Sequence, residues 1–150
     1  MKIISLSFFT LLFILISGCE NSKASLPKEI LPDEVIRRHI QLLNEKNIDG
    51  AESCMIDNRR NKINWDIASL IYIKLISIEE ETNKAFSESY MKTGRGSIVK
   101  PFELKVYNVT IDKKYTQAAI ESTDNGINIW HYFVIKQNKD SPWLIDDWGI

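Results

Sequence analysis

Acid–base chemistry is the first possibility that the residue types of this chain raise. The candidates are His39, His131, Tyr132, Asp146 and Asp147. Histidine titrates near neutral pH, so His131 could act as a general base. The alternative is a histidine that is satisfied by hydrogen bonds or that lies at a sheet interface, and we expect this structural role. We likewise expect His39 to lie at the border of a helix.

The two adjacent aspartates and the tryptophans suggest two further kinds of site. If Asp146 and Asp147 lie on a strand, they point to opposite faces and cannot act as a carboxylate pair. Trp130, Trp143 and Trp148 could stack on a sugar or another flat ligand, although aromatic residues on sheets more often belong to a core or an interface. The candidate pocket or interface residues are therefore Trp130, His131, Tyr132 and Asp146.

Metal, nucleotide and nucleic-acid chemistry find little support in the sequence. No pair of His, Cys, Asp or Glu residues has a spacing typical of a zinc site, and Gly94-Arg95-Gly96 lacks the context of a phosphate-binding loop. We therefore expect no metal and no cofactor. The formal net charge is −1, and the 18 basic and 20 acidic residues after Gly18 form no basic cluster. This pattern argues against a nucleic-acid partner.

The amino terminus has the features of an export signal. Lys2 precedes the run Ile3 to Ile16, in which Ser5, Ser7 and Thr10 are the only residues that are not apolar. As a helix the run would span about 21 Å, which is short of the ~30 Å hydrocarbon core of a bilayer. A removable signal peptide over residues 1–18 therefore fits better than a permanent transmembrane helix.

The residues that follow this run resemble the lipobox of bacterial lipoproteins. Ile16-Ser17-Gly18-Cys19 has an aliphatic residue, two small residues and then cysteine. The resemblance implies cleavage before Cys19 and attachment of a diacylglyceryl group to its thiol. Two acyl chains give stable membrane attachment, so the resemblance implies a lipid anchor on the extracytoplasmic face of the cell membrane. Cys54 then has no cysteine partner, and we expect a buried, unreactive thiol.

A polar, proline-containing segment separates the proposed anchor from the folded part. Residues 19–32 include Pro27 and Pro32 and have no sustained periodicity, which is typical of a tether. Asp33 is a suitable N-cap for an amphipathic helix that reaches about Lys46. Asn47 should end this helix, and a second short helix should cover 49–55. We expect a single domain over residues 33–150.

The rest of the chain predicts an antiparallel sheet. We expect strands over 70–78, 102–111, 115–122, 127–136 and 143–148, joined by an irregular or helical segment over 79–92 and by turns at Lys113-Lys114 and Asp124-Asn125-Gly126. The apolar alternation slips near Asn108, which predicts a β-bulge there. The overall class is α+β, with amino-terminal helices packed in a curved antiparallel sheet.

The strand over 127–136 is apolar on both faces. Trp130, Tyr132 and Val134 share one face, whereas His131 and Phe133 lie on the other. One face should cover the long helix. The second face then needs another partner, and a homodimer packed sheet to sheet is the simplest candidate.

The order of two helices and then a bent sheet resembles the cone-shaped, nuclear transport factor 2-like fold. The similarity is clearest in three segments, and together with the lipobox these segments resemble a family of small lipoproteins from Gram-positive bacteria whose domain has no known function. The segments are 73–80 (IKLISIEE), 100–102 (KPF) and 143–149 (WLIDDWG). The resemblance implies a fold and a location, but no reaction.

These observations favour a non-catalytic, membrane-tethered domain that binds a protein, a peptide or a small ligand at the cell surface. A small enzyme of the isomerase or hydrolase kind is the alternative, with Tyr132, His131 or Asp146 as its acid or base inside the cone. A purely structural, dimerising subunit is a third alternative.

Overall fold

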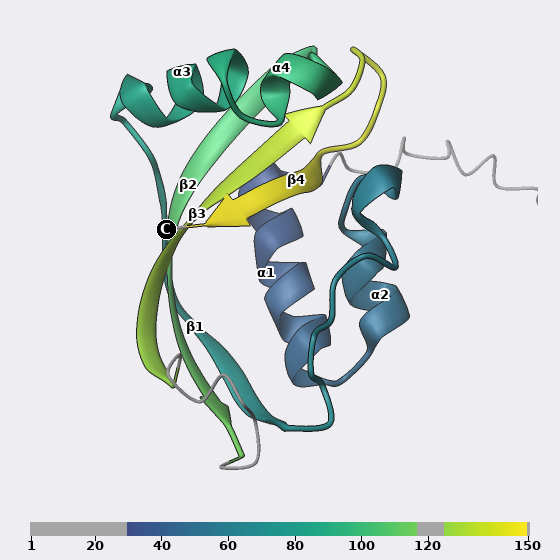
Figure 1. Ribbon diagram of the computed structural model, residues 1–150, viewed down its shortest axis with the longest axis vertical. Coiled ribbons are helices and arrows are strands. Elements are labelled where there is room, and N and C mark those ends of the chain that lie inside the picture. The colour runs from purple at the N-terminus through teal and green to yellow at the C-terminus, as the bar shows by residue number, and fades with distance from the viewer. Residues whose placement is uncertain (1–29, 117–124, 150) are drawn as a thin grey trace, which may run out of the picture.

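The computed structural model describes residues 30–116 and 125–149, and this part of the chain has the predicted α+β class (Figure 1). A four-stranded antiparallel sheet has the strand order β1-β2-β3-β4, so it is a meander in sequence order. The elements are α1 (Pro32–Asn44), α2 (Ile48–Ser53), the 3-10 turn η1 (Asp57–Arg59), β1 (Leu70–Glu80), α3 (Lys84–Lys92), α4 (Gly96–Val99), β2 (Glu103–Tyr115), β3 (Gly126–Lys136) and β4 (Leu144–Gly149).

Helix α1 begins one residue earlier than the sequence predicted. Pro32 occupies the first turn, where its missing N–H costs nothing, and the Glu34 carboxylate accepts a 3.0 Å hydrogen bond from the backbone N–H of Leu31. The prediction of Asp33 as N-cap is therefore wrong, because Asp33 lies within the first turn. The helix ends at Asn44, before the predicted end near Lys46, and Lys46 with a φ of 59° turns the chain away, so Asn47 does not end α1 as predicted. The Asn47 side chain instead accepts from the Gly50 N–H at 2.9 Å and caps the start of α2.

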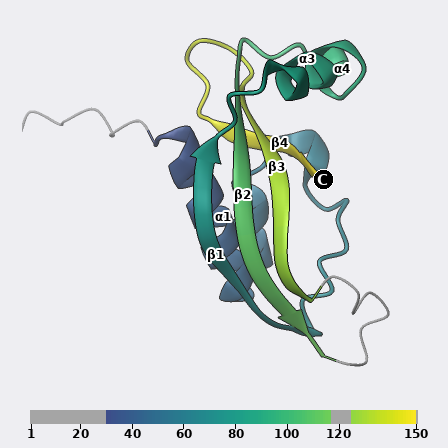
Figure 2. The same cartoon turned by 90° about the vertical axis from the view of Figure 1, so that its left-hand side faces the viewer.

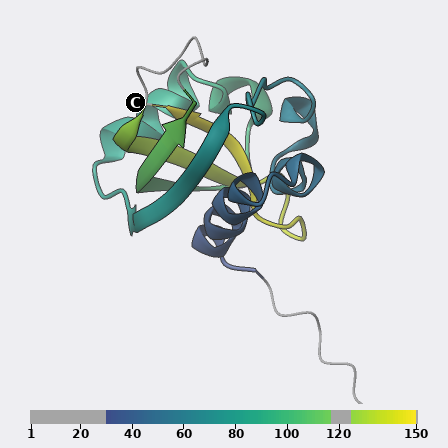
Figure 3. The same ribbon diagram turned by 90° about the horizontal axis from the view of Figure 1, so that it is seen from below.

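The main hydrophobic core lies between α1 and the concave face of the sheet. Figure 1 shows the sheet bent around α1, and the view from below in Figure 3 shows α1 and α2 lying together along one side of it. The apolar stripe of α1 supplies one side of this core. Residues of all four strands supply the other side, and α2 with the segment that follows it adds Ala51, Cys54 and Met55. Its most buried members are Ile36, Ala51, Met55, Val109, Ile111, Tyr132, Val134 and Ile145.

The strand register differs from the sequence prediction at two points. The pairing of β2 with β3 is continuous from Glu103 to Lys113, so there is no bulge near Asn108 and no turn at Lys113-Lys114. The irregularities lie instead in β1, where the register against β2 shifts between Leu70 and Tyr72 and again between Leu75 and Ser77. An extra residue at each shift increases the local bend of this edge strand.

The apparent slip of the apolar pattern in β2 has a different cause. Val109 and Ile111 face α1, whereas Leu104 and Val106 face the opposite side of the sheet, where they are covered by other residues. Burial therefore changes face along a regular strand. If one buried face is assumed along the whole strand, this change in the apolar pattern is misinterpreted as a β-bulge.

Helices α3 and α4 provide the cover on the convex face (Figure 2). Tyr90 stacks on Phe133 with ring centroids 4.6 Å apart, and Ile135 is fully buried beneath them. We expected a second copy of the chain to cover this whole face, but the same chain covers the half near the carboxy end of β3. Ile127 and Ile129 remain 71% and 55% exposed, so a homodimer stays a prediction only for the other half of this face.

Several predictions lie outside the described residues. These are the signal peptide, Cys19, the tether up to residue 29, most of the predicted strand over 115–122 and Asp124. No helix in the described ranges is both long and apolar enough to cross a membrane.

Candidate functional site

The four candidate residues from the sequence lie in three different surroundings. Trp130 and Tyr132 face α1, His131 faces the opposite side of the sheet, and Asp146 lies in a buried polar network at the end of β4. The structure therefore confirms the predicted alternation along β3. It does not bring these four side chains together.

Tyr132 lies in an aromatic cluster with His39. The ring centroid of His39 is 5.3 Å from that of Trp65, 6.1 Å from that of Trp148 and 6.4 Å from that of Tyr132. The His39 Nδ1 lies 3.0 Å from the Ala51 carbonyl oxygen, which only accepts, so Nδ1 carries the proton. Burial lowers the pKa of His39 to about 4 and raises that of Tyr132. At neutral pH His39 is therefore an uncharged core residue.

The other two candidates on β3 also have partners within the protein. The Nζ atom of Lys113 lies 4.3 Å from the ring centroid of Trp130. His131 stacks on Phe86 of α3 with centroids 3.7 Å apart, and its Nε2 is 3.2 Å from a carboxylate oxygen of Glu81. His131 therefore joins α3 to the convex face. It is not on the α1 side, where the enzymatic alternative placed it.

Asp146 is fully buried and is bound on two sides. It accepts a 2.6 Å hydrogen bond from the Tyr90 hydroxyl, and the Arg95 guanidinium donates to both of its oxygens, with the shortest contact at 2.7 Å. Arg95 also donates to the Asn58 amide oxygen at 2.8 Å. The hydrogen bonds to Asp146 raise the pKa of Arg95, and burial together with the Asp146 carboxylate raises that of Tyr90. The carboxylate therefore holds α3, α4 and η1 against β4.

The adjacent Asp147 does not point away from Asp146 as we expected. The register of β4 against β3 shifts between Phe133 and Val134, which places a bulge at this point. Asp147 pairs with Phe133, whose ring stacks on Tyr90, and Asp146 is bonded to the same Tyr90. Both carboxylates are thus on the convex side. Burial raises the pKa of Asp147, Arg59 at 3.0 Å lowers it, and the charge of Asp146 raises it further.

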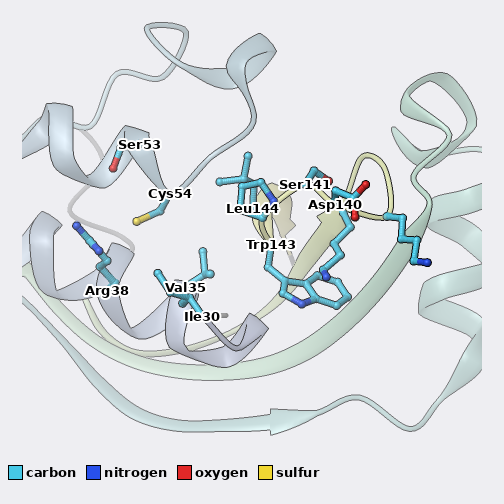
Figure 4. Close-up of a pocket in the computed structure, with 12 residues that line it drawn as sticks. Ile30, Val35, Arg38, Ser53, Cys54, Asp140, Ser141, Trp143 and Leu144 are labelled. Atoms are coloured by element: carbon cyan, nitrogen blue, oxygen red, sulfur yellow. The ribbon is translucent and has the colours of Figure 1, made fainter. Parts of the chain in front are cut away.

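A depression lies elsewhere in the described structure, at the amino-terminal end of α1. This groove has a volume of about 640 Å³, which is within the usual range for small-molecule sites. Its walls are the beginning of α1, the end of α2 and the loop from β3 to β4 (Figure 4). None of the four candidate residues from the sequence lines it.

The groove combines an apolar floor with cationic groups. Val35, Trp143 and Leu144 contribute apolar surface, and the picture shows Cys54 and Arg38 on the side of the helices (Figure 4). Three lining residues are cationic (Arg38, Lys136 and Lys139) and one is acidic (Asp140). Burial raises the pKa of the Cys54 thiol. The thiol is therefore unsuited to nucleophilic chemistry here.

Backbone bonds keep the two walls of the groove in place. The Ile145 N–H donates to the Cys54 carbonyl at 2.9 Å, and the Ile56 N–H donates to the Ile145 carbonyl at 3.0 Å. The segment after α2 therefore pairs with β4, and the loop wall is held through Leu144. Sequence reasoning named one residue of this site, Trp143, as a possible ligand-stacking residue. It missed the site as a whole, because the lining comes from three separate segments, one of which was treated only as a loop.

The described residues contain no set of side chains arranged to bind a metal ion. No group of three or more His, Cys, Asp or Glu side chains there is arranged to hold a metal ion. The neighbouring carboxylates of Asp146 and Asp147 have arginines as their partners.

Comparison with known proteins gives one result. Residues 33–149 match the domain described as "Domain of unknown function (DUF4829)". No curated protein and no solved structure gives a significant match. Because the match covers most of the chain, the protein belongs to the DUF4829 family.

Proposed function

We propose that this protein is a lipoprotein anchored through Cys19 on the extracytoplasmic face of the cell membrane, and that its domain binds a ligand without transforming it. The observation that carries the binding role is the groove at the start of α1, which combines an apolar floor with cationic groups. We also propose that the domain is a distant variant of the nuclear transport factor 2-like fold. The bent sheet around α1 supports this relation.

Two features support the anchor. The first is the coincidence of Lys2, the apolar run and the small pair Ser17-Gly18 directly before Cys19. The second is the position of the groove, whose lining includes Ile30 near the end of the polar segment expected as the tether. The proposed tether therefore joins the domain beside the groove.

The surroundings of the ionisable residues favour binding over catalysis. A general acid or base must reach a substrate atom within hydrogen-bond distance. His39 and Asp146 are fully buried, and both are bonded within the protein. The groove, in contrast, offers surface and charge with a thiol whose raised pKa disfavours the thiolate.

The anchor is tested with a matched pair of cysteine variants in bacteria supplied with an alkyne analogue of palmitate. Cys19→Ala should abolish the lipid label and release the protein from the membrane fraction, because no thiol is left at the cleavage site. Cys54→Ala should keep both the label and the membrane location. Labelling that survives Cys19→Ala would overturn the anchor.

Ligand binding is tested by thermal-shift screening of the mature chain, which starts at residue 19 and carries Cys19→Ser. The screen uses metabolites, cell-wall fragments, lipids and peptides. A Ser53→Trp variant fills the groove, since Ser53 lines it and is exposed; Ser89→Trp, at an exposed position on α3, is the control. A ligand should stabilise the parent chain and the control but not Ser53→Trp. Stabilisation by no compound, or equal stabilisation of Ser53→Trp, would contradict binding in the groove.

A further inference from the structure

We propose that the ligand of the groove is a single-chain amphiphile with an anionic headgroup, which the protein takes up as a monomer. This inference rests on the proposed binding function and goes beyond it by naming the ligand class. It follows from three features of the groove: its floor, its charge and its place beside the tether.

The floor suits a hydrocarbon chain. Val35 and Trp143 are nearly buried and belong to the main core, so their remaining surface is firmly positioned. Leu144 and the exposed Ile30 extend this apolar surface along the groove. Each methylene group that leaves water for such a surface improves affinity by about fourfold. A chain of several methylene groups therefore gains more here than a small polar molecule does.

The charge suits an anionic headgroup. Arg38 and Lys139 line the groove, and neither forms an ion pair with another residue in the ranges that the structure describes. Lys136 lies with its Nζ atom 5.4 Å from the ring centroid of Trp143, so a cation is held directly above the apolar floor. Asp140 is the one acidic residue of the lining, against the three cationic ones. This combination attracts an anion and disfavours a cationic ligand.

The tether keeps the groove within reach of a membrane. Eleven peptide units separate Cys19 from Ile30, and a chain of this length spans at most about 40 Å. If Cys19 carries the lipid, the groove cannot move farther than this distance from the bilayer surface. The groove is therefore held close to the surface from which monomeric amphiphiles leave the bilayer.

The decisive experiment compares three probes with the mature Cys19→Ser chain by isothermal titration calorimetry, below the critical micelle concentration. The probes are lysophosphatidylglycerol with a twelve-carbon chain, lysophosphatidylcholine with the same chain, and glycerol 1-phosphate. The anionic lysolipid should bind about tenfold or more tightly than the zwitterionic one, as expected for two favourable charge contacts. Glycerol 1-phosphate, which lacks the chain, should show no measurable binding.

Charge variants locate the headgroup. Arg38→Gln combined with Lys139→Gln should weaken binding of the anionic lysolipid by about tenfold and leave binding of the zwitterionic lysolipid unchanged. The control combines Arg37→Gln with Lys92→Gln, which removes the same charge from exposed positions that do not line the groove. The control should bind both lysolipids as the parent chain does. Ser53→Trp should weaken both.

The outcomes separate the two proposals. Equal affinity for both lysolipids, or an equal loss in the control variant, would overturn the anionic headgroup. No lysolipid binding, together with a groove-dependent thermal shift by some other compound, would overturn the amphiphile and keep the binding function. No groove-dependent ligand of any class would overturn the binding function itself.

Discussion

The hydroxyl of Tyr90 donates a 2.6 Å hydrogen bond to the buried carboxylate of Asp146, although 56 positions separate the two residues in the chain. The bond joins α3 to β4, and Arg95 at the start of α4 holds the same carboxylate from another side. A single buried charge thus fixes the two helices that cover the convex face. Polar groups in such a network depend on one another, because an unpaired buried charge is costly.

Tyr90→Phe should therefore destabilise the protein by about 1.5–3 kcal/mol, the usual cost of losing a buried hydrogen bond to a charged group. Chemical denaturation in urea measures this change. Tyr72→Phe is the matched control, since its hydroxyl donates to Asp112 at 3.1 Å on the outer side of the sheet, and it should cause a much smaller change. Equal losses of free energy of unfolding in the two variants would contradict a larger contribution of the Tyr90–Asp146 bond than of the Tyr72–Asp112 bond.

His39 should make the stability depend on pH. Its pKa is about 4 in the folded protein and 6.5 in the unfolded chain, so the unfolded chain binds more protons between these values. The contribution of the neutral His39 to the free energy of unfolding is fully present above pH 6.5 and is lost as the pH falls towards 4. The loss should reach about 2 kcal/mol at pH 5 relative to pH 7.

The measurement for His39 is urea denaturation at pH 5 and pH 7, combined with an NMR titration of the imidazole. His39→Gln should remove most of the pH-dependent difference, because glutamine has no charge to gain. An imidazole signal of His39 that titrates at pH 6.5 in the folded protein would contradict the prediction.

Gly96 should tolerate no side chain. A Cβ atom at this position would lie 2.5 Å from the Tyr90 Cε1 atom and 2.8 Å from the Met91 sulfur, so either α4 or the tyrosine has to move. Gly96→Ala should destabilise the protein by about 1–3 kcal/mol, as overpacking usually does. Gly149→Ala is the control, since a Cβ there meets nothing within 4 Å. Thermal unfolding of the two variants distinguishes them.

Cys54 should react slowly with alkylating reagents in the folded protein. The thiol is buried, and burial raises its pKa, so little thiolate forms at pH 8. The rate of iodoacetamide labelling of the Cys19→Ser chain should rise sharply on addition of urea. Labelling at the same rate with and without urea would show that the thiol is accessible in the folded state.

Local patterns in the sequence were sufficient for most elements. The spacing of Ile36, Ile40 and Leu43 correctly predicted α1, and the strict alternation along β3 correctly assigned its two faces. These predictions succeed because the period of a helix or a strand depends on the backbone alone. The same reasoning failed at Lys113-Lys114, where polar residues suggested a turn but Lys113 is buried within β2.

The sequence by itself therefore determined the α+β class, the course of the main helix and the two-faced character of β3. Only the tertiary structure decided what covers the second face, why Asp146 and Asp147 share a side, and where a ligand could bind. Each of these depends on contacts between distant segments: Tyr90 with Asp146, β3 with β4, and α1 with the loop that carries Trp143. Such contacts leave no periodic trace in a single chain, because the residues involved are neighbours only after folding.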